Sequence, residues 1–311
     1  MPTPGVDPNV SSEYGATRDG QPICYHRAPS PDLAPWIGRL YVARDTAPAG
    51  YVMSCGLLSD TATLRIEVDG YWRGETGRGA LNPSSPVMFV GPNSRRMPVT
   101  SSGTYVGLGM SMRPGACHML GGPRVASIVD SAVPGEAVGI DVPALMAQFA
   151  EDGSPEEWLA VLENMIRRQV ADRKALPPSP VTRMFERLSF ERPSVTVAEA
   201  AQICCVDRRK LERIVLRDFG LSPKQVLRRA RALDMAAFLR GVSDTSEGEE
   251  FALRYYDDSH LIHEFVELFG MPPSQFASTP QPLMTIALES RQARRLETLE
   301  RIEPGANRPW L

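Results

Sequence analysis

The sequence is poor in the features that mark secreted, membrane-bound or zinc-binding proteins. Its five cysteines are odd in number and form no CxxC pair, so neither a disulfide framework nor a zinc site is expected. No apolar run reaches the roughly 18 residues needed to span a bilayer, and the N-terminus lacks the basic and apolar segments of a signal peptide. These absences predict a cytoplasmic protein that has no membrane partner.

Signatures of catalysis are also missing. The sequence contains no GxSxG, Walker or dinucleotide-binding motif. The first half of the chain has only His26 and His118, which lie far apart and form no HxH pair that could begin a metal site. We therefore expect no catalytic residue, no metal and no cofactor, and we predict that the protein is not an enzyme.

The net charge is only -3, but the charge is unevenly distributed. Residues 207–240 contain ten basic and four acidic residues, whereas residues 241–280 contain one basic and eight acidic residues. A basic segment of this kind is suited to the phosphates of nucleic acid, and an acidic one is repelled by them. The first segment is therefore predicted to anchor on DNA, and the second to touch it sparingly.

Residues 195–226 carry the pattern of two short helices joined by a tight turn. The first helix is indicated by small and apolar residues at three- and four-residue steps: Val197, Ala200, Ala201 and Cys204. Asp207 then provides an N-cap for a second helix, which Gly220 and Pro223 end. Two such helices form a helix-turn-helix unit.

The second of these helices has one apolar and one basic face. Its basic residues are predicted to contact double-stranded DNA through base edges and phosphates: Arg208, Arg209, Lys210, Arg213 and Arg217. A solvated charged face is the alternative for such a helix, and the helix alone does not decide between the two.

A repeat favours the DNA-binding interpretation. Fifty positions further on, the same cap, apolar face and stop recur as Asp257, Leu261, Phe265, Phe269, Gly270 and Pro273. The intervening segment VLRRARALDMAAFLRG has an apolar side that can bridge the two units rigidly. Two recognition helices on one rigid chain predict contacts with two successive major grooves.

The segments DRRKLERIVLRDFGLSP and DDSHLIHEFVELFGMPPSQF resemble the DNA-binding domain of the AraC/XylS family of transcription regulators. In the second unit, Ser259 and His260 stand where the first unit has Arg209 and Lys210, so they are candidate contacts to base edges or phosphates. The resemblance implies the alternative that this pair caps or packs the start of the helix. His263 is a further candidate DNA contact, less favoured than Arg213. The sequence departs from the family at Cys205 and Arg254, where glycine is usual in the turns. It departs also at Glu250, where a small residue is usual, and at His263, where arginine is usual.

The first half of the chain has the pattern of antiparallel strands. In TATLRIEVDG, apolar and charged residues alternate, as in a half-buried strand, and closely spaced strands with glycine and proline turns follow. This order, with a short helix after MRPG, resembles the cupin-like sensory half of AraC-type regulators. The interior of such a barrel is predicted to bind a small-molecule effector, with Trp36, Arg65, Tyr71 and Arg73 as candidate contacts; filling of the core is the alternative for each.

Residues 155–176 form the clearest helix of the first half. Its apolar stripe consists of Trp158, Leu162, Met165, Ile166 and Val170. The stripe can pack on its own barrel or against the same helix of a second subunit, and the resemblance implies a homodimer.

These patterns predict an α+β protein, in which an N-terminal cupin-like antiparallel β domain precedes a C-terminal all-α double helix-turn-helix domain. The predicted segments are a flexible arm at 1–20, a sensory and dimerisation domain at 21–176, a linker at 177–182, a DNA-binding domain at 183–282 and a helical extension at 283–311. The extension can pack on the protein or add phosphate contacts through its arginines.

The predicted function is sequence-specific DNA-binding transcription regulation, as an activator controlled by a small-molecule effector in the N-terminal domain. The resemblance implies contact with RNA polymerase. The alternatives are a ligand-sensing module with weakened DNA binding and, less favoured, a cupin-like enzyme fused to a DNA-binding domain.

Overall fold

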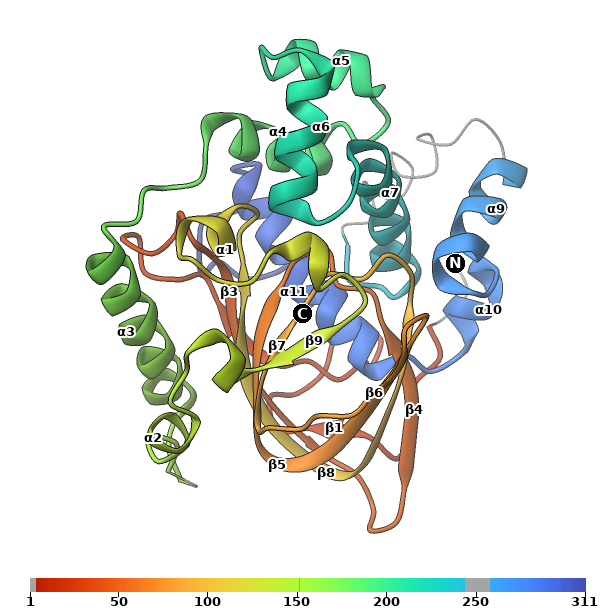
Figure 1. Ribbon diagram of the computed structural model, residues 1–311. Coiled ribbons are helices and arrows are strands. Elements are labelled where there is room, and N and C mark those ends of the chain that lie inside the picture. The colour runs from red at the N-terminus through yellow and green to blue at the C-terminus, as the bar shows by residue number, and fades with distance from the viewer. Residues whose placement is uncertain (1–3, 151, 244–257) are drawn as a thin grey trace.

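The computed structural model describes residues 4–150, 152–243 and 258–311, and it has an antiparallel sheet followed by a helical domain (Figure 1). The predicted α+β class is therefore confirmed. The predicted roles of Glu250, Arg254 and Asp257 lie outside the described residues. Within those residues, no helix has both the length and the apolar character needed to cross a membrane.

Nine strands form one curved sheet in the described residues. They are β1 (Ser11–Ser12), β2 (Tyr25–Arg27), β3 (Ile37–Thr46), β4 (Val52–Leu57), β5 (Thr63–Thr76), β6 (Gly79–Leu81), β7 (Val87–Val90), β8 (Met97–Met112) and β9 (Ala132–Pro134). The central order is β1-β3-β8-β5-β7-β9, with β2 on β3, β4 on β8 and β6 on β5, and every pairing is antiparallel.

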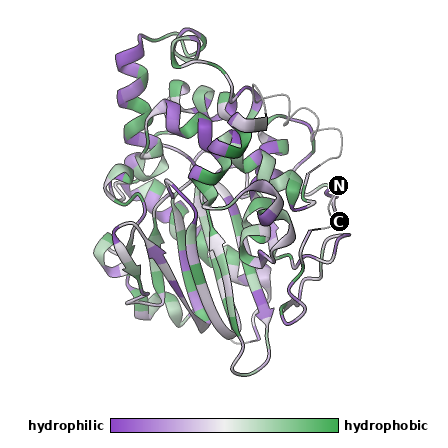
Figure 2. Cartoon of the chain, turned by 90° about the vertical axis from the view of Figure 1, so that its right-hand side faces the viewer, coloured by the Kyte–Doolittle hydropathy of each residue, from purple (hydrophilic) through white to green (hydrophobic). Residues whose placement is uncertain are grey.

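The alternation of residues along the strands gives the sheet two different faces. Figure 2 shows apolar and polar residues alternating along the strands. Leu64 and Ile66 of β5 pair in register with Met110 and Leu108 of β8, and all four belong to one apolar core. Arg65, between the first two, points to the opposite face, because successive side chains of a strand alternate.

The outer face of the sheet is covered by short helices and one long helix. The elements are α1 (Ala116–Met119), η1 (Val125–Ser127), η2 (Gly135–Val138), α2 (Val142–Met146) and α3 (Pro155–Arg173). A capping box between Ser154 and Glu157 starts α3. Trp158 and Leu162 of its apolar stripe are buried in the core under the sheet. The stripe therefore packs on its own domain.

The helical domain contains both predicted recognition helices, and its first helix begins at Pro180, inside the segment 177–182 that the sequence predicts to be a linker. Its described helices are α4 (Pro180–Glu191), α5 (Val197–Ile203), α6 (Arg208–Phe219), α7 (Pro223–Leu239), α9 (Asp258–Phe269), α10 (Pro273–Ser278) and α11 (Pro282–Thr298). Each of α5, α6 and α7 is capped by a side chain that accepts from a backbone amide of the first turn: Thr196, Asp207 and Ser222. Of these three caps, the sequence analysis predicts Asp207, and the structure adds Thr196 and Ser222.

The C-terminal extension packs into the protein as α11. This helix contacts β4, β3 and α7, and it crosses the opening of the curved sheet (Figure 1). Its three arginines, Arg291, Arg294 and Arg295, are buried, so they lie away from any DNA surface. The extension therefore packs on the protein, which is one of the two roles predicted for it.

Residues 4–20, for which the composition predicts a flexible arm, lie against the folded chain. The Gly5 amide donates to the Ala277 carbonyl at 2.8 Å, and Arg240 donates to the Gly5 carbonyl at 2.7 Å. Ser11 and Ser12 form β1, which pairs with β3. The arm is held by backbone hydrogen bonds, which leave no compositional signal in the sequence.

Candidate functional site

The turn of the first helix-turn-helix unit is made by Cys205 in a left-handed conformation. Its φ is 53°, a region that residues with a Cβ adopt at a cost and that glycine adopts freely. This geometry favours glycine, the residue that the AraC/XylS resemblance implies at this position. The turn keeps its shape here although cysteine replaces glycine.

The recognition helix α6 has a buried apolar side and an exposed basic side. Leu211 and Val215 are fully buried against α4, α5 and α7, whereas all five predicted DNA-binding residues of α6 are exposed. Asp207 accepts from the Lys210 amide at 2.8 Å and fixes the first turn of the helix. The side that faces solvent is thus the side that the sequence predicts to face DNA.

Ion pairs divide these five basic residues into two groups. Arg208 is paired with Glu212 at 2.9 Å, and Arg217 with Asp218 at 2.6 Å. Arg209, Lys210 and Arg213 have no side-chain partner within the described part of the chain. The charges of these last three are available to an outside anion.

The C-terminal end of α6 is docked on the sensory domain. Asp218 is buried there, accepts from the Thr182 hydroxyl at 2.6 Å and receives the Gly115 amide on its backbone carbonyl at 3.3 Å. Val129 of the sensory domain belongs to the same apolar cluster as Phe219. The helix is therefore anchored at its end while its first turns remain open.

The bridging helix α7 lies between α6 and α9, and it pairs with the acidic residues of α9. Arg228 binds Glu264 at 2.9 Å and Glu267 at 2.6 Å, and Arg231 binds Glu264 at 2.7 Å. The pKa of Glu267 is lowered, chiefly by its hydrogen bond to Arg228. The acidic balance counted for residues 241–280 thus overstates the repulsion at α9, because these two charges are neutralised across the helices.

The second recognition helix presents a surface of mixed character. Ser259, His260 and His263 are exposed on α9. They share that surface with Ile262 and Val266, which are 44% and 39% exposed. Apolar groups on a recognition helix can contact thymine methyl groups.

A groove of about 500 Å³ separates the two units. Residues of the first unit and of α7 form one wall, with Thr196 and Lys224 among them, and His260 and His263 of α9 lie on the other. The structure therefore brings the second-unit histidines next to the bridging helix. Arg209 and Arg213 lie outside this groove, on the open side of α6.

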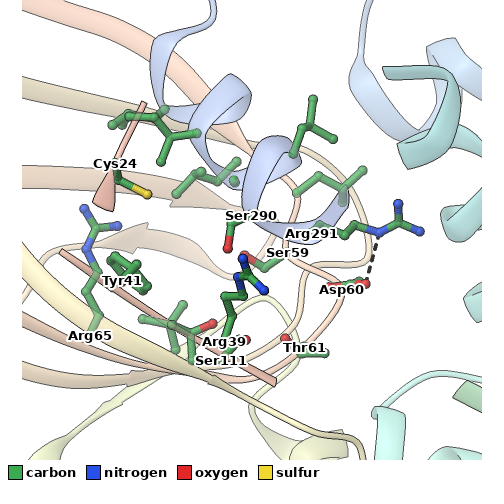
Figure 3. A pocket seen from close by; sticks show the side chains of 18 of the residues that line it. Cys24, Arg39, Tyr41, Ser59, Asp60, Thr61, Arg65, Ser111, Ser290 and Arg291 are labelled. Carbon is green, nitrogen blue, oxygen red and sulfur yellow. Dashed lines mark hydrogen bonds and ion pairs between the residues drawn. The ribbon is translucent and has the colours of Figure 1, made fainter. Parts of the chain in front are cut away.

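The inner face of the sheet and α11 enclose a cavity of about 150 Å³. It is lined by Arg39, Tyr41, Ala43 and Asp45 of β3, Arg65 and Trp72 of β5, Tyr105 and Ser111 of β8, and Leu283, Ile286 and Ser290 of α11, among others. Figure 3 shows Cys24, Tyr41 and Arg65 at one end and the Asp60–Arg291 ion pair at the other.

Of the four effector contacts predicted from sequence, the structure brings only Arg65 to this cavity. Trp36 lies in the core on the other side of the sheet and donates to the Leu176 carbonyl at 3.3 Å. Tyr71 and Arg73 are exposed, because they flank Trp72 and so point away from the face that Trp72 lines. The sequence shows the strand but not which of its faces encloses the cavity.

Arg65 is held by aromatic groups. Its guanidinium lies 4.3 Å from the ring centroid of Trp72 and 5.2 Å from that of Tyr105, and its Nε donates to the Tyr105 hydroxyl at 3.1 Å. Such contacts stabilise a cation without neutralising it. Burial raises the pKa of two neighbouring carboxyl groups, Asp45 and Glu67, to about 7, and the charge of Arg65 partly opposes both shifts.

Hydrogen bonds and ion pairs join residues that line the cavity to the bridging helix α7. Arg229 of α7 is buried and donates to the carbonyls of Asn93 and Asp60 at 2.7 and 2.8 Å. Arg291 of α11 binds Asp60 at 3.1 Å and Asp234 of α7 at 2.7 Å. Sequence patterns gave no sign of these contacts, since buried arginines look like surface charges in a sequence.

Comparisons with known proteins place the helix-turn-helix region in a described family. Residues 200–279 match a family model described as a helix-turn-helix domain. No curated protein sequence matches the chain. Among solved structures, ToxT from Vibrio cholerae is 11% identical over 76% of this chain and 97% of that chain, with a TM-score of 0.42.

Two further solved structures are similar at the same low level. ToxT from Vibrio cholerae with a bound unsaturated fatty acid is 10% identical over 76% of this chain and 94% of that chain, with a TM-score of 0.42. The AraC-like transcriptional activator CuxR is 15% identical over 68% of this chain and 86% of that chain, with a TM-score of 0.29.

The matched domain, the capped basic helix α6 and the second helix α9 define a DNA-binding transcription regulator. The matched residues 200–279 contain both segments that resemble the AraC/XylS family, so a helix-turn-helix domain lies where these segments predict it.

Proposed function

We propose that this protein is a sequence-specific, non-catalytic transcription regulator that binds DNA chiefly through α6 and responds to a small molecule held by its N-terminal domain. The observation that carries the proposal is the group of unpaired cations on α6, Arg209, Lys210 and Arg213, on a helix whose start is fixed by Asp207. Side chains near the start of a recognition helix reach base edges, and those further along reach phosphates.

The arrangement of the two recognition helices supports a bipartite DNA site. The ion pairs from Arg228 to Glu264 and Glu267 fix α9 on α7, and α7 packs against α6. The two helices are thereby held on one rigid unit, which suits half-sites in successive major grooves of one duplex. Dimerisation, and activation by contact with RNA polymerase, are the further steps that the AraC/XylS resemblance implies.

A ligand-sensing module with weakened DNA binding is the second candidate. The acidic character of residues 241–280 favoured it, but Glu264 and Glu267 are neutralised by arginines of α7. The exposed face of α9 carries histidines and apolar groups, so it adds little electrostatic attraction of its own. The proposal therefore assigns most of the affinity to α6.

The proposal is tested by titrating the protein into labelled DNA from upstream of its own gene and measuring fluorescence anisotropy at several salt concentrations. We expect specific binding with a steep salt dependence, which the Arg209→Ala and Arg213→Ala variants each weaken. A variant that loses one phosphate contact should have a salt slope smaller by about one. A residue that reads a base should instead cost specificity.

Arg168→Ala is the matched control, because Arg168 is exposed on α3, remote from both recognition helices. Its affinity and salt slope should equal those of the unmodified protein. If DNA binding is absent, or if Arg168→Ala weakens it as much as Arg213→Ala does, α6 is not the DNA-binding element.

A further inference from the structure

The cavity between the sheet and α11 contains polar groups that lack partners. Both carboxylate oxygens of Asp45, the indole nitrogen of Trp72 and the hydroxyl of Ser111 are buried without a hydrogen-bond partner in the described residues. Asp45 and Trp72 are 4% and 1% exposed. Buried polar groups are nearly always satisfied, so several unsatisfied ones around one cavity indicate that a ligand occupies it. The Trp72 indole and the Ser111 hydroxyl can donate to a carboxylate, and Asp45 can do so in its protonated form.

Arg65 gives the cavity a positive charge that the protein does not neutralise. Arginine stays protonated in proteins, and within the described residues this guanidinium forms no ion pair. Its contacts are the Tyr105 hydroxyl and the faces of Trp72 and Tyr105. A guanidinium held in this way, at one end of the cavity, is a docking point for an anion.

The remaining walls of the cavity determine the size and polarity of the part of the ligand that lies beyond its charged group. Leu57, Leu283, Ile286 and Leu288 contribute apolar surface. The volume of about 150 Å³ is close to that of cavities in other proteins that accept a single benzene molecule. Such walls leave space for one ring or a branched chain, and a volume of this size is too small for a nucleotide.

We infer that this cavity binds a compact monocarboxylate whose carboxylate pairs with Arg65 and whose ring-sized apolar body lies against Trp72 and α11. The inference rests on the proposed function and deepens it, because it names the class of effector. It also makes the C-terminal extension a part of the binding site, since Ile286 and Ser290 of α11 line the same cavity as Arg65.

The position of α11 supplies a route from this ligand to the DNA-binding domain. The segment of α11 that lines the cavity also carries Arg291, which binds Asp60 beside the cavity and Asp234 of α7. A ligand that shifts α11 would act on an ion pair to the helix that bridges the two recognition helices. The effector would thus be detected by α11 as well as by the strands.

Isothermal titration calorimetry of the full-length protein with three carboxylates, benzoate, cyclohexanecarboxylate and 3-methylbutanoate, tests the inference. Benzamide serves as the neutral partner of benzoate, and glucose as a neutral polyol. We expect at least one carboxylate to bind, and benzoate to bind at least tenfold more tightly than benzamide. Binding of none of the three carboxylates, equal binding of benzoate and benzamide, or binding of glucose alone would overturn it.

Variants locate the site. Arg65→Gln should lower carboxylate affinity at least tenfold, whereas Arg65→Lys should keep the preference for benzoate over benzamide. Ile286→Trp, which fills the cavity from α11, should abolish binding. Arg78→Gln, at an exposed turn of the same hairpin, is the control and should bind as the unmodified protein does.

The same samples are tested for DNA binding and, by circular dichroism, for folding. Folded protein that binds DNA but no carboxylate would refute the ligand class and leave the proposed regulator intact. Carboxylate binding without DNA binding would refute the proposed function instead. If Arg65→Gln is poorly folded, the comparison of benzoate with benzamide on Arg65→Lys decides the matter.

Discussion

Arg291 of α11 binds Asp234 of α7 through its Nη1 at 2.7 Å, and both side chains are buried. The same guanidinium reaches Asp60 of the sensory domain at 3.1 Å. One arginine of the C-terminal extension therefore joins the loop beside the cavity to the helix between the recognition helices. The pKa of Arg291 is raised: burial opposes the shift, but Asp234 and Asp60 outweigh it.

Removal of this arginine should be strongly destabilising. Arg291→Ala leaves Asp234 buried with fewer partners, and loss of one member of a buried pair costs about 3 kcal/mol or more in the free energy of unfolding. Urea denaturation measures the change. Arg187→Ala is the control, because Arg187 forms surface pairs with Glu191 and Glu300, and it should cost less than about 1 kcal/mol. Equal losses for the two variants would show that Arg291 does not act as a buried tie.

Replacing Cys205 with glycine should remove backbone strain from the turn. A left-handed conformation costs a residue with a Cβ about 1 kcal/mol, so Cys205→Gly should raise the free energy of unfolding by about 0.5 kcal/mol or more. The neighbouring Cys204 has a φ of -78° and is buried, so Cys204→Gly should lower stability. Thermal unfolding of the two variants gives the comparison, and destabilisation by both would contradict this account of the turn.

The helix-turn-helix could be predicted from sequence because its determinants are local. The cap at Asp207, the stop at Gly220 and the spacing of Leu211 and Val215 all lie within a few turns of one another, and the structure has a helix between them. The repeat fifty residues later added a second, independent copy of the same signal. Residues close in sequence were enough to define this element.

The cavity could not be predicted in the same way because its walls come from distant parts of the chain. The alternation on β5 shows that Arg65 and Leu64 face opposite sides, but not which side is enclosed. That depends on α11, whose Ile286 comes to lie against residues more than two hundred positions earlier. Arg229 and Arg291 were equally hidden, because their burial follows from partners in other elements.

The cap of the recognition helix should affect both stability and DNA binding. Asp207→Ala removes the acceptor of the Lys210 amide and should cost about 1 kcal/mol in the free energy of unfolding. The first turn of α6, which carries Arg209, would then fray and weaken DNA affinity. Asp207→Asn keeps a side-chain acceptor and should stay close to the unmodified protein in both respects. Anisotropy titration and urea denaturation on the same preparations test this, and equal behaviour of the two variants would argue against a capping role.

Asp45 should make stability depend on pH near neutrality. Burial raises its pKa from the ordinary value of 3.8 to about 7 in the folded protein, and the positive charge of Arg65 partly opposes this shift. Between these two values the folded state keeps a proton that the unfolded state has released, so the free energy of unfolding falls as the pH rises through this window. Glu67, whose pKa is also raised to about 7, acts in the same direction.

Substitution of Asp45 by its amide separates the two carboxyl groups. Asp45→Asn cannot ionise, so its denaturation midpoint should fall less between pH 5 and pH 8 than that of the unmodified protein, with the remainder due to Glu67. The affinity for a carboxylate ligand should also fall as the pH rises from 5 to 8 and should fall less in Asp45→Asn, because an ionised Asp45 near Arg65 competes with the ligand for the guanidinium. If Asp45→Asn leaves the pH dependence of stability unchanged, the Asp45 carboxyl group is already ionised in the folded protein. Arg65 would then face a carboxylate of the protein itself and could not serve as the open anion site that the proposed ligand needs.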